Sequence, residues 1–83
     1  MSLSKEKIGS CYLTKDGSIY RLETYEEDSQ FVMGDRKFPA RMLRLGDIKG
    51  WERYSKYGVH YDNKNRLIKE ITKEEYPEYF LWQ

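Results

Sequence analysis

Alternating apolar and polar positions near the start of the chain predict an antiparallel β-hairpin. Residues 18–25 place Tyr20 and Leu22 on one side and charged residues on the other, because a period of two sends successive side chains to opposite faces of a sheet. Residues 8–14 form a second apolar run. An Asp-Gly pair separates the two runs and is a strong hairpin signal, since both residues tolerate the positive φ of a type I′ turn. We therefore expect Tyr20 and Leu22 to face the core.

Shorter apolar runs predict further strands. Residues 30–33 are expected to form a third short strand. Residues 58–61 and 66–71 flank a run of Asp, Asn and Lys that favours a turn, which predicts a second hairpin. Residues 48–54 carry an apolar side chain at every third position, and this spacing fits either a strand or the end of a helical unit.

One internal segment carries helix signals. Residues 39–46 begin with a proline and end with a glycine, which is the order expected for a short helix. Phe38, Met42 and Leu45 have the spacing of one helical face. We therefore predict a helix of about two turns here, with an extended strand as the competing interpretation.

The end of the chain carries a second helix signal. Thr72 is followed three residues later by Glu75, a capping-box pattern that predicts a short helix or helical turn. Together these segments predict an α+β fold, with a small, mainly antiparallel sheet or partly open barrel of about five short strands and one or two short helices. The length supports a single domain over residues 1–83, in which the polar residues 1–7 are expected to be flexible.

The composition is that of a folded domain. Hydrophobic residues make up 39% of the chain and aromatic residues 16%, while the net charge is only +1. Disordered chains, in contrast, are poor in aromatics and carry a high net charge. Because each ring buries a large area, eight Tyr, three Phe and two Trp can build a core from few residues.

Cysteine usage and the lack of long apolar runs bear on the compartment. Cys11 is the single cysteine, so no intrachain disulfide is possible. No apolar run is long enough to span a bilayer, and no signal-peptide pattern opens the sequence. We therefore expect a cytoplasmic protein without a membrane contact; whether the first three residues are native or an expression leader stays open.

Charge is distributed unevenly along the chain. Residues 36–69 contain ten Lys or Arg and only three acids, and aromatic residues are threaded between them. The segments on either side are acidic on balance. This basic, aromatic middle is the best functional signal in the sequence, because Lys and Arg neutralise phosphates or carboxylates and exposed aromatics stack on bases or pack at interfaces.

No catalytic or cofactor motif is visible. One Cys and one His cannot form a tetrahedral zinc site, and the scattered glycines match no phosphate-binding loop. A Cys11–His60 dyad, or His60 acting as an acid or base, is chemically conceivable, but a buried cysteine and an exposed strand histidine are the simpler interpretation. We therefore expect no metal, no cofactor and no enzymatic activity.

Two binding hypotheses remain. The leading one is a non-enzymatic binding or accessory module that acts through protein–protein interaction or self-association, because Tyr, Trp and Arg are enriched at binding hot spots. The alternative is weak binding of single-stranded nucleic acid or RNA through residues 36–69, although a near-neutral chain differs from dedicated nucleic-acid domains. The candidate residues are Arg41, Arg44, Lys49, Trp51, Arg53 and Lys56 in a basic and aromatic patch, and Tyr79, Phe80 and Trp82 in a possible interaction tail.

Both hypotheses depend on where the aromatic residues of this stretch point. Trp51, Tyr54, Tyr57 and Tyr61 serve as core residues if they point inward and as contact residues if they point outward. The sequence leaves both alternatives open. It carries no signature stretch of the known small-barrel families, so we assign no family from it.

Overall fold

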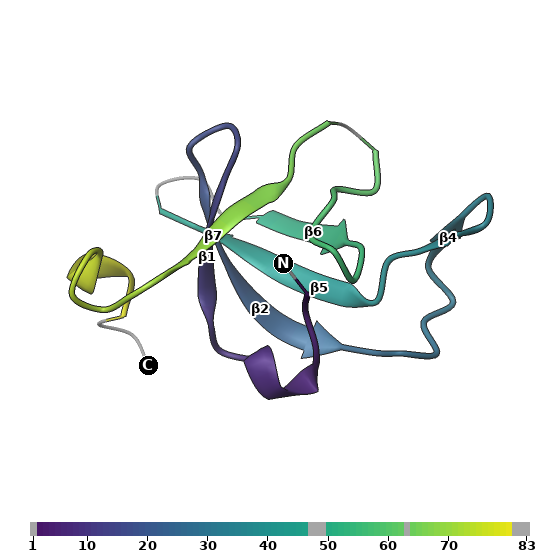
Figure 1. Cartoon of the computed structure of the whole chain (residues 1–83), viewed down its shortest axis with the longest axis horizontal. Coiled ribbons are helices and arrows are strands. Elements are labelled where there is room, and N and C mark those ends of the chain that lie inside the picture. Colours follow the sequence, from purple (N-terminus) through teal and green to yellow (C-terminus); the bar gives the residue numbers. More distant parts are fainter. Residues whose placement is uncertain (1, 47–49, 63, 81–83) are drawn as a thin grey trace.

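The computed structural model describes residues 2–46, 50–62 and 64–80, and these residues form a small, mainly antiparallel β-structure (Figure 1). A five-stranded sheet has the order β6-β5-β2-β1-β7, and a separate two-stranded sheet pairs β3 with β4. The strands are β1 (Cys11–Thr14), β2 (Ile19–Tyr25), β3 (Val32–Met33), β4 (Arg36–Lys37), β5 (Ala40–Leu45), β6 (Gly50–Tyr54) and β7 (Leu67–Ile71).

The helical content is limited to short turns, so the expected α+β class is wrong. In the part of the chain that the structure describes, the helical segments are the three-residue 3-10 turns η1 (Lys5–Lys7) and η2 (Pro77–Tyr79). Thr72 and Glu75 do form the predicted capping box, since each accepts the backbone N–H of the other. Only a turn follows it, because Pro77 has no N–H to continue a helix.

The predicted helix over residues 39–46 is also wrong, because this segment contains β5, an interior strand of the five-stranded sheet. It pairs along its length with β2 on one side and β6 on the other. Ala40 and Met42 are buried while Arg41 is exposed, which is the alternation of a strand rather than a helical stripe. Hydrogen bonds to two neighbouring strands outweigh the local helix signals here.

The first predicted hairpin is confirmed, with a different turn. β1 and β2 pair antiparallel, and Tyr12 lies opposite Tyr20. Gly17 has a φ of 87°, but no other described residue except glycine has a positive φ, so Asp16 does not adopt the type I′ geometry. The loop instead has three residues and ends on a glycine in the left-handed region, as three-residue hairpin loops commonly do.

The second predicted hairpin is present only as a short contact. Val59 and Arg66 form an isolated bridge, and His60 donates its N–H to the carbonyl of Asn65. β7 pairs mainly with β1. A further bridge joins His60 to Tyr54, so residues 58–60 connect the β6 edge of the sheet to the start of β7.

The larger core cluster lies on one face of the curved sheet. Its buried side chains include Tyr20 and Leu22, as predicted, and Tyr54, whose ring meets that of Tyr20 edge to face at 5.4 Å. Leu3 also belongs to this cluster and donates its N–H to the carbonyl of Lys56. The expected flexibility of residues 1–7 stays a prediction.

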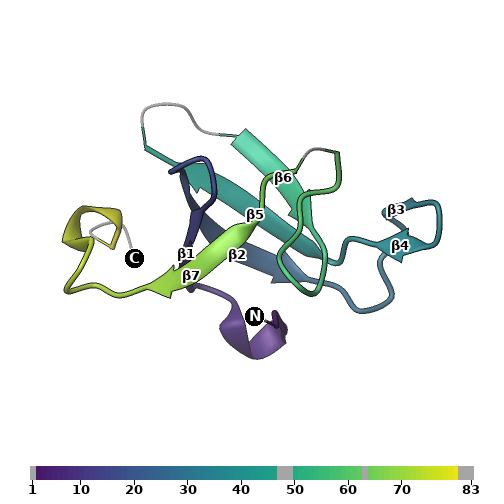
Figure 2. The ribbon, with the colours of Figure 1, turned by 45° about the horizontal axis from the view of Figure 1, so that its top comes forward.

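The opposite face and the ends of the molecule carry the remaining elements. Cys11, Ile19 and Ile71 form a second buried cluster, against which the segment containing η2 packs. The β3–β4 hairpin projects from the sheet at the other end of the molecule (Figures 1 and 2). Within the described residues, no helix has the length and apolar character needed to cross a membrane.

Candidate binding surface

The structure separates the predicted patch residues into three places. Arg41, Trp51 and Arg53 lie together on one face of the β5–β6 pair. Arg44 is three positions from Arg41 in the same strand and therefore points to the opposite face. Lys56 follows β6 in a turn. Lys49 and Trp82 lie outside the described residues.

Arg44 belongs to a different, polar environment. Its charge lies close enough to Asp16 to contribute to the lowered pKa of that carboxyl, whose largest cause is the hydrogen bond from the Thr14 hydroxyl. On the same side of the sheet, burial raises the pKa values of Tyr20 and Tyr54. These hydroxyls are part of the core rather than of a contact surface.

The predicted interaction tail is used in packing. Tyr79 and Phe80 are half-buried against the cluster of Cys11, Ile19 and Ile71. Their rings cover the end of the sheet where β1 and β7 pair. The tail therefore contributes to the fold through these two residues.

The face formed by Arg41, Trp51 and Arg53 is completed by two aromatic residues from loops. The Arg41 guanidinium lies 3.9 Å from the centroid of the Trp51 ring, and that of Arg53 lies 5.3 Å from the centroid of the Phe31 ring. Tyr61 joins this group through an edge-to-face contact with Phe31 at 5.2 Å. We call these five residues the arginine–aromatic face; they line a shallow hollow of about 210 Å³ together with Glu52.

The two arginines of this face are directly opposed. Arg41 and Arg53 are cross-strand partners on β5 and β6, and like charges in this position destabilise a sheet. Neither forms an ion pair with a described residue, whereas Lys7, Arg21 and Lys69 do elsewhere. The Nη1 atom of Arg53 is also buried without a hydrogen-bond acceptor among the described residues. The face thus has an excess of positive charge that the fold itself does not neutralise.

An aromatic triad attaches the β3–β4 hairpin to the sheet beside this face. Phe31, Phe38 and Tyr61 contact one another edge to face, with ring centroids 5.2 to 6.4 Å apart. Phe38 donates its N–H to the carbonyl of Phe31 and so closes the base of the hairpin. Val32 and Met33, the two residues of β3 in this hairpin, are each 49% exposed.

His60 contacts Glu52 and Tyr61, two of the residues that line the hollow of this face. It is buried, not exposed as expected, and its Nε2 lies 2.8 Å from a carboxylate oxygen of Glu52. Its Nδ1 accepts the N–H of Asp62, so Nε2 carries the proton and donates it to Glu52. The ring packs against Tyr61 at 4.5 Å. Cys11 lies in the smaller buried cluster with Ile19 and Ile71, so the structure does not bring a Cys11–His60 dyad together.

Sequence reasoning found three of the five residues of the face. It missed Phe31, which it placed inside the strand predicted over residues 30–33 without a contact role, and it left the orientation of Tyr61 open. Of the four aromatics in question, Tyr54 is core, Tyr61 is half-buried, and Trp51 and Tyr57 are exposed. Phe31 and Phe38 flank the hairpin symmetrically, and that pairing is the signal that could have identified Phe31.

The described residues contain no group of three His, Cys, Asp or Glu side chains placed to hold a metal ion. Comparisons with protein-family models, with curated proteins and with solved structures find no match for this chain.

Proposed function

We propose that this chain is a non-enzymatic protein-binding module that contacts its partner through the arginine–aromatic face and the adjoining β3–β4 hairpin. The observation that carries the proposal is the opposed pair Arg41 and Arg53, stacked on aromatic rings without a carboxylate partner among the described residues. Residues that lower the stability of a fold, and whose cost no other contact in the fold offsets, are often functional. An acidic partner would supply the missing carboxylates.

The apolar part of the surface favours a protein partner over nucleic acid. Val32 and Met33 expose aliphatic and thioether groups on the β3–β4 hairpin, which the aromatic triad attaches to the sheet beside the arginine–aromatic face. Such a mixture of apolar, aromatic and Arg residues is typical of protein interfaces. The whole chain has a net charge of +1 and a pI of about 7.8, whereas dedicated nucleic-acid domains are strongly basic. We therefore keep nucleic-acid binding as the second candidate, supported by the exposed Trp51 with its stacked arginine.

The partner is either another protein or a second copy of this chain. Glu26, Glu27 and Asp28 form an exposed acidic segment between β2 and β3, and a second copy could present it to the two arginines. A cytoplasmic location is part of this proposal, supported by the one unbridged thiol.

The proposal is tested with two matched surface variants. Trp51 and Ile68 are 50% and 48% exposed and lie on the two edge strands, β6 and β7. The wild type and Ile68→Ser should capture the same proteins, and Trp51→Ser should not capture them. Each captured protein, once purified, should bind the wild type directly. Sedimentation of the three proteins tests self-association in the same way.

Two results would contradict the proposal. One is that Trp51→Ser and Ile68→Ser behave alike. Both variants would then either keep the bound proteins and oligomeric state of the wild type or both would lose them. The other is that Trp51→Ser specifically abolishes salt-dependent binding of a labelled single-stranded oligonucleotide, which would establish the nucleic-acid alternative.

A further inference from the structure

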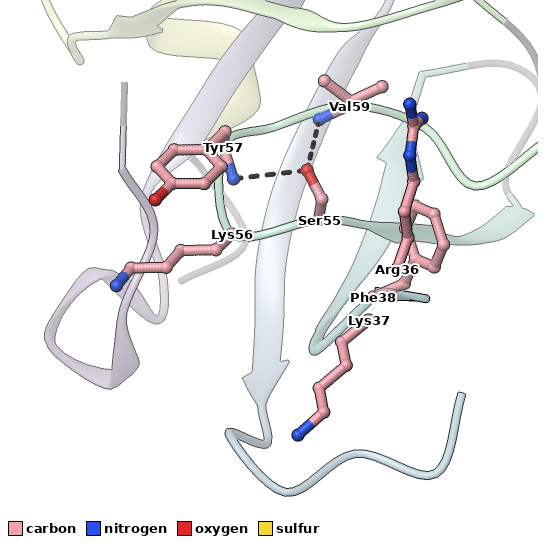
Figure 3. A pocket seen from close by; sticks show the side chains of 7 residues that line it. All are labelled: Arg36, Lys37, Phe38, Ser55, Lys56, Tyr57 and Val59. Atoms are coloured by element: carbon pink, nitrogen blue, oxygen red, sulfur yellow. Dashed lines mark hydrogen bonds between the residues drawn. The ribbon is translucent and has the colours of Figure 1, made fainter. Parts of the chain in front are cut away.

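A second hollow, of about 350 Å³, lies between the β4 strand and the turn that follows β6 (Figure 3). It is on the other side of the aromatic triad from the arginine–aromatic face, since Phe38 lines this hollow while Phe31 and Tyr61 line the first. Its lining consists of Arg36, Lys37, Phe38, Ser55, Lys56, Tyr57 and Val59. Arg36 and Lys37 belong to the β3–β4 hairpin, whereas the lining residues from the turn after β6 lie outside the surface assigned to the proposed function.

Positive charge surrounds this hollow without compensation. Arg36, Lys37 and Lys56 line it, and no acidic residue does. None of the three forms an ion pair with a residue that the structure describes. In Figure 3 these long side chains extend in different directions around the opening, so they offer charge at several points rather than at one.

The wall and floor of the hollow are apolar and aromatic. Phe38 is buried and Val59 is half-buried, while Tyr57 stands 66% exposed across the hollow from Arg36 (Figure 3). An apolar side chain placed between them would be removed from water on several sides. The hollow is therefore suited to a ligand that alternates apolar and anionic groups.

Ser55 adds an oriented hydrogen-bond donor. Its Oγ accepts the backbone N–H groups of Tyr57 and Val59, at 3.2 and 3.1 Å (Figure 3). These two bonds fix the oxygen, and its own proton has no acceptor among the described residues. A hydroxyl held in this way can donate to a ligand oxygen.

The hollow continues into a neighbouring one. A third hollow, of about 440 Å³, shares Lys37 and Lys56 with it and runs past Pro39 and Tyr25. Two hollows that share a pair of lysines form an elongated groove, which suits an extended chain better than a compact ligand. The one acid of the third hollow, Glu27, belongs only to that hollow, so negative charge on a ligand is favoured at the shared lysines.

We propose that this groove binds an extended acidic segment of a partner protein. The carboxylates of the bound segment lie near Lys37, Lys56 and Arg36. An apolar side chain between two of these acidic residues enters between Phe38 and Tyr57. The inference goes beyond the proposed function because it requires neither Trp51 nor Arg41. A nucleic-acid strand would use the same cations, but beyond a thymine methyl it has no branched aliphatic side chain to place on the floor at Val59.

The test uses a defined probe and isotope-labelled protein. An acetylated and amidated octapeptide that alternates Glu and Val should shift the amide resonances of Tyr57 and Val59, whose N–H groups bond to Ser55. Binding should weaken as salt increases, because the contacts are between exposed charges. A peptide with Gln in place of Glu should bind at least about tenfold more weakly.

Two double variants separate the groove from net charge. Lys37→Ser with Lys56→Ser removes the shared lysines, and Lys15→Ser with Lys64→Ser removes two exposed lysines that line a different hollow. Both lower the net charge equally. The first should weaken binding of the Glu–Val peptide about tenfold, and the second should leave the affinity within about twofold.

Several outcomes would overturn the inference. These are equal binding of the Gln peptide, an equal loss in both double variants, or the same amide shifts at similar affinity with inorganic phosphate or an oligothymidylate. Trp51→Ser should bind the peptide like the wild type. The groove and the arginine–aromatic face can therefore fail or succeed separately.

Discussion

Arg41 and Arg53 lie directly opposite each other on β5 and β6, and each guanidinium is held against an aromatic ring instead of a carboxylate of a described residue. Cation–π contacts compensate such charges only in part, and a cross-strand pair of like charges still costs stability. In the proposed function, the carboxylates of an external partner would offset this cost. This relationship leads to a prediction about stability that does not require the partner to be known.

Arg53→Met should raise the free energy of unfolding. The change removes the repulsion with Arg41 and the buried Nη1 that has no acceptor among the described residues, while the unbranched stem can still pack on Phe31. We expect a gain of about 0.5–1 kcal/mol, measured by urea denaturation.

Arg21→Met is the matched control for this prediction. Arg21 also lies in a strand, but it bonds to Glu23 at 2.7 Å, so its loss should lower stability by about 0.5 kcal/mol. If Arg53→Met is destabilising to the same degree as Arg21→Met, the opposed arginine pair is not a cost to the fold.

The fold was predictable where local turn chemistry decides it. The β1–β2 hairpin followed from the turn at Gly17. The strand β5 was missed because the spacing of Phe38, Met42 and Leu45 also fits a helix, and only pairing with β2 and β6 distinguishes the two. The pairing with β2 joins segments that are distant in sequence, and local patterns do not encode it.

Gly58 provides a second prediction, about how the sheet edge is joined to β7. It has a φ of 82°, and an added Cβ would lie 3.1 Å from the Cβ of the buried Leu67. Its carbonyl also accepts the N–H of Leu67. Gly58→Ala should therefore lower the free energy of unfolding by about 2–3 kcal/mol, from backbone strain and steric overlap together.

Gly17→Ala isolates the backbone contribution. Gly17 has a similar φ of 87°, but an added Cβ there meets nothing within 4 Å. Its replacement should cost only about 1 kcal/mol. Urea denaturation of both variants gives the difference, and equal losses would mean that the approach of Leu67 to Gly58 is not restrictive.

The buried His60 leads to a third prediction. Glu52→Ala removes the carboxylate that accepts the Nε2 proton of the buried His60, and the loss of this hydrogen bond should cost about 1–3 kcal/mol. Glu52→Gln keeps an acceptor oxygen and should cost less than about 1 kcal/mol. The nitrogen-15 shifts of the imidazole should show the proton on Nε2, because Nδ1 accepts the N–H of Asp62. A proton on Nδ1 in the wild type would refute this arrangement.

The candidate surface was predictable only in part, and for a physical reason. Arg41, Trp51 and Arg53 were identified from charge and aromatic content, and the β5–β6 register explains why they meet while Arg44 points away. The contribution of Phe31 depends on how the β3–β4 hairpin packs against the 60–62 segment. That contact joins residues far apart in sequence, and no periodicity reports it.

A fourth prediction concerns alkaline pH. Burial, with a smaller contribution from the charge of Glu70, raises the pKa of Tyr12 from 10.0 to about 12. Because the folded state holds this proton more tightly than the unfolded state, the contribution of Tyr12 is complete below pH 10 and is lost as the pH rises towards 12. In that window the free energy of unfolding should fall by up to about 1.4 kcal/mol per pH unit from Tyr12 alone. In Tyr12→Phe the fall between pH 10 and 11 should be smaller by about 1 kcal/mol, while below pH 9 the two proteins should differ by a constant offset. Urea denaturation followed by circular dichroism measures both curves, and parallel curves up to pH 11 would show that the Tyr12 hydroxyl does not titrate as its burial requires.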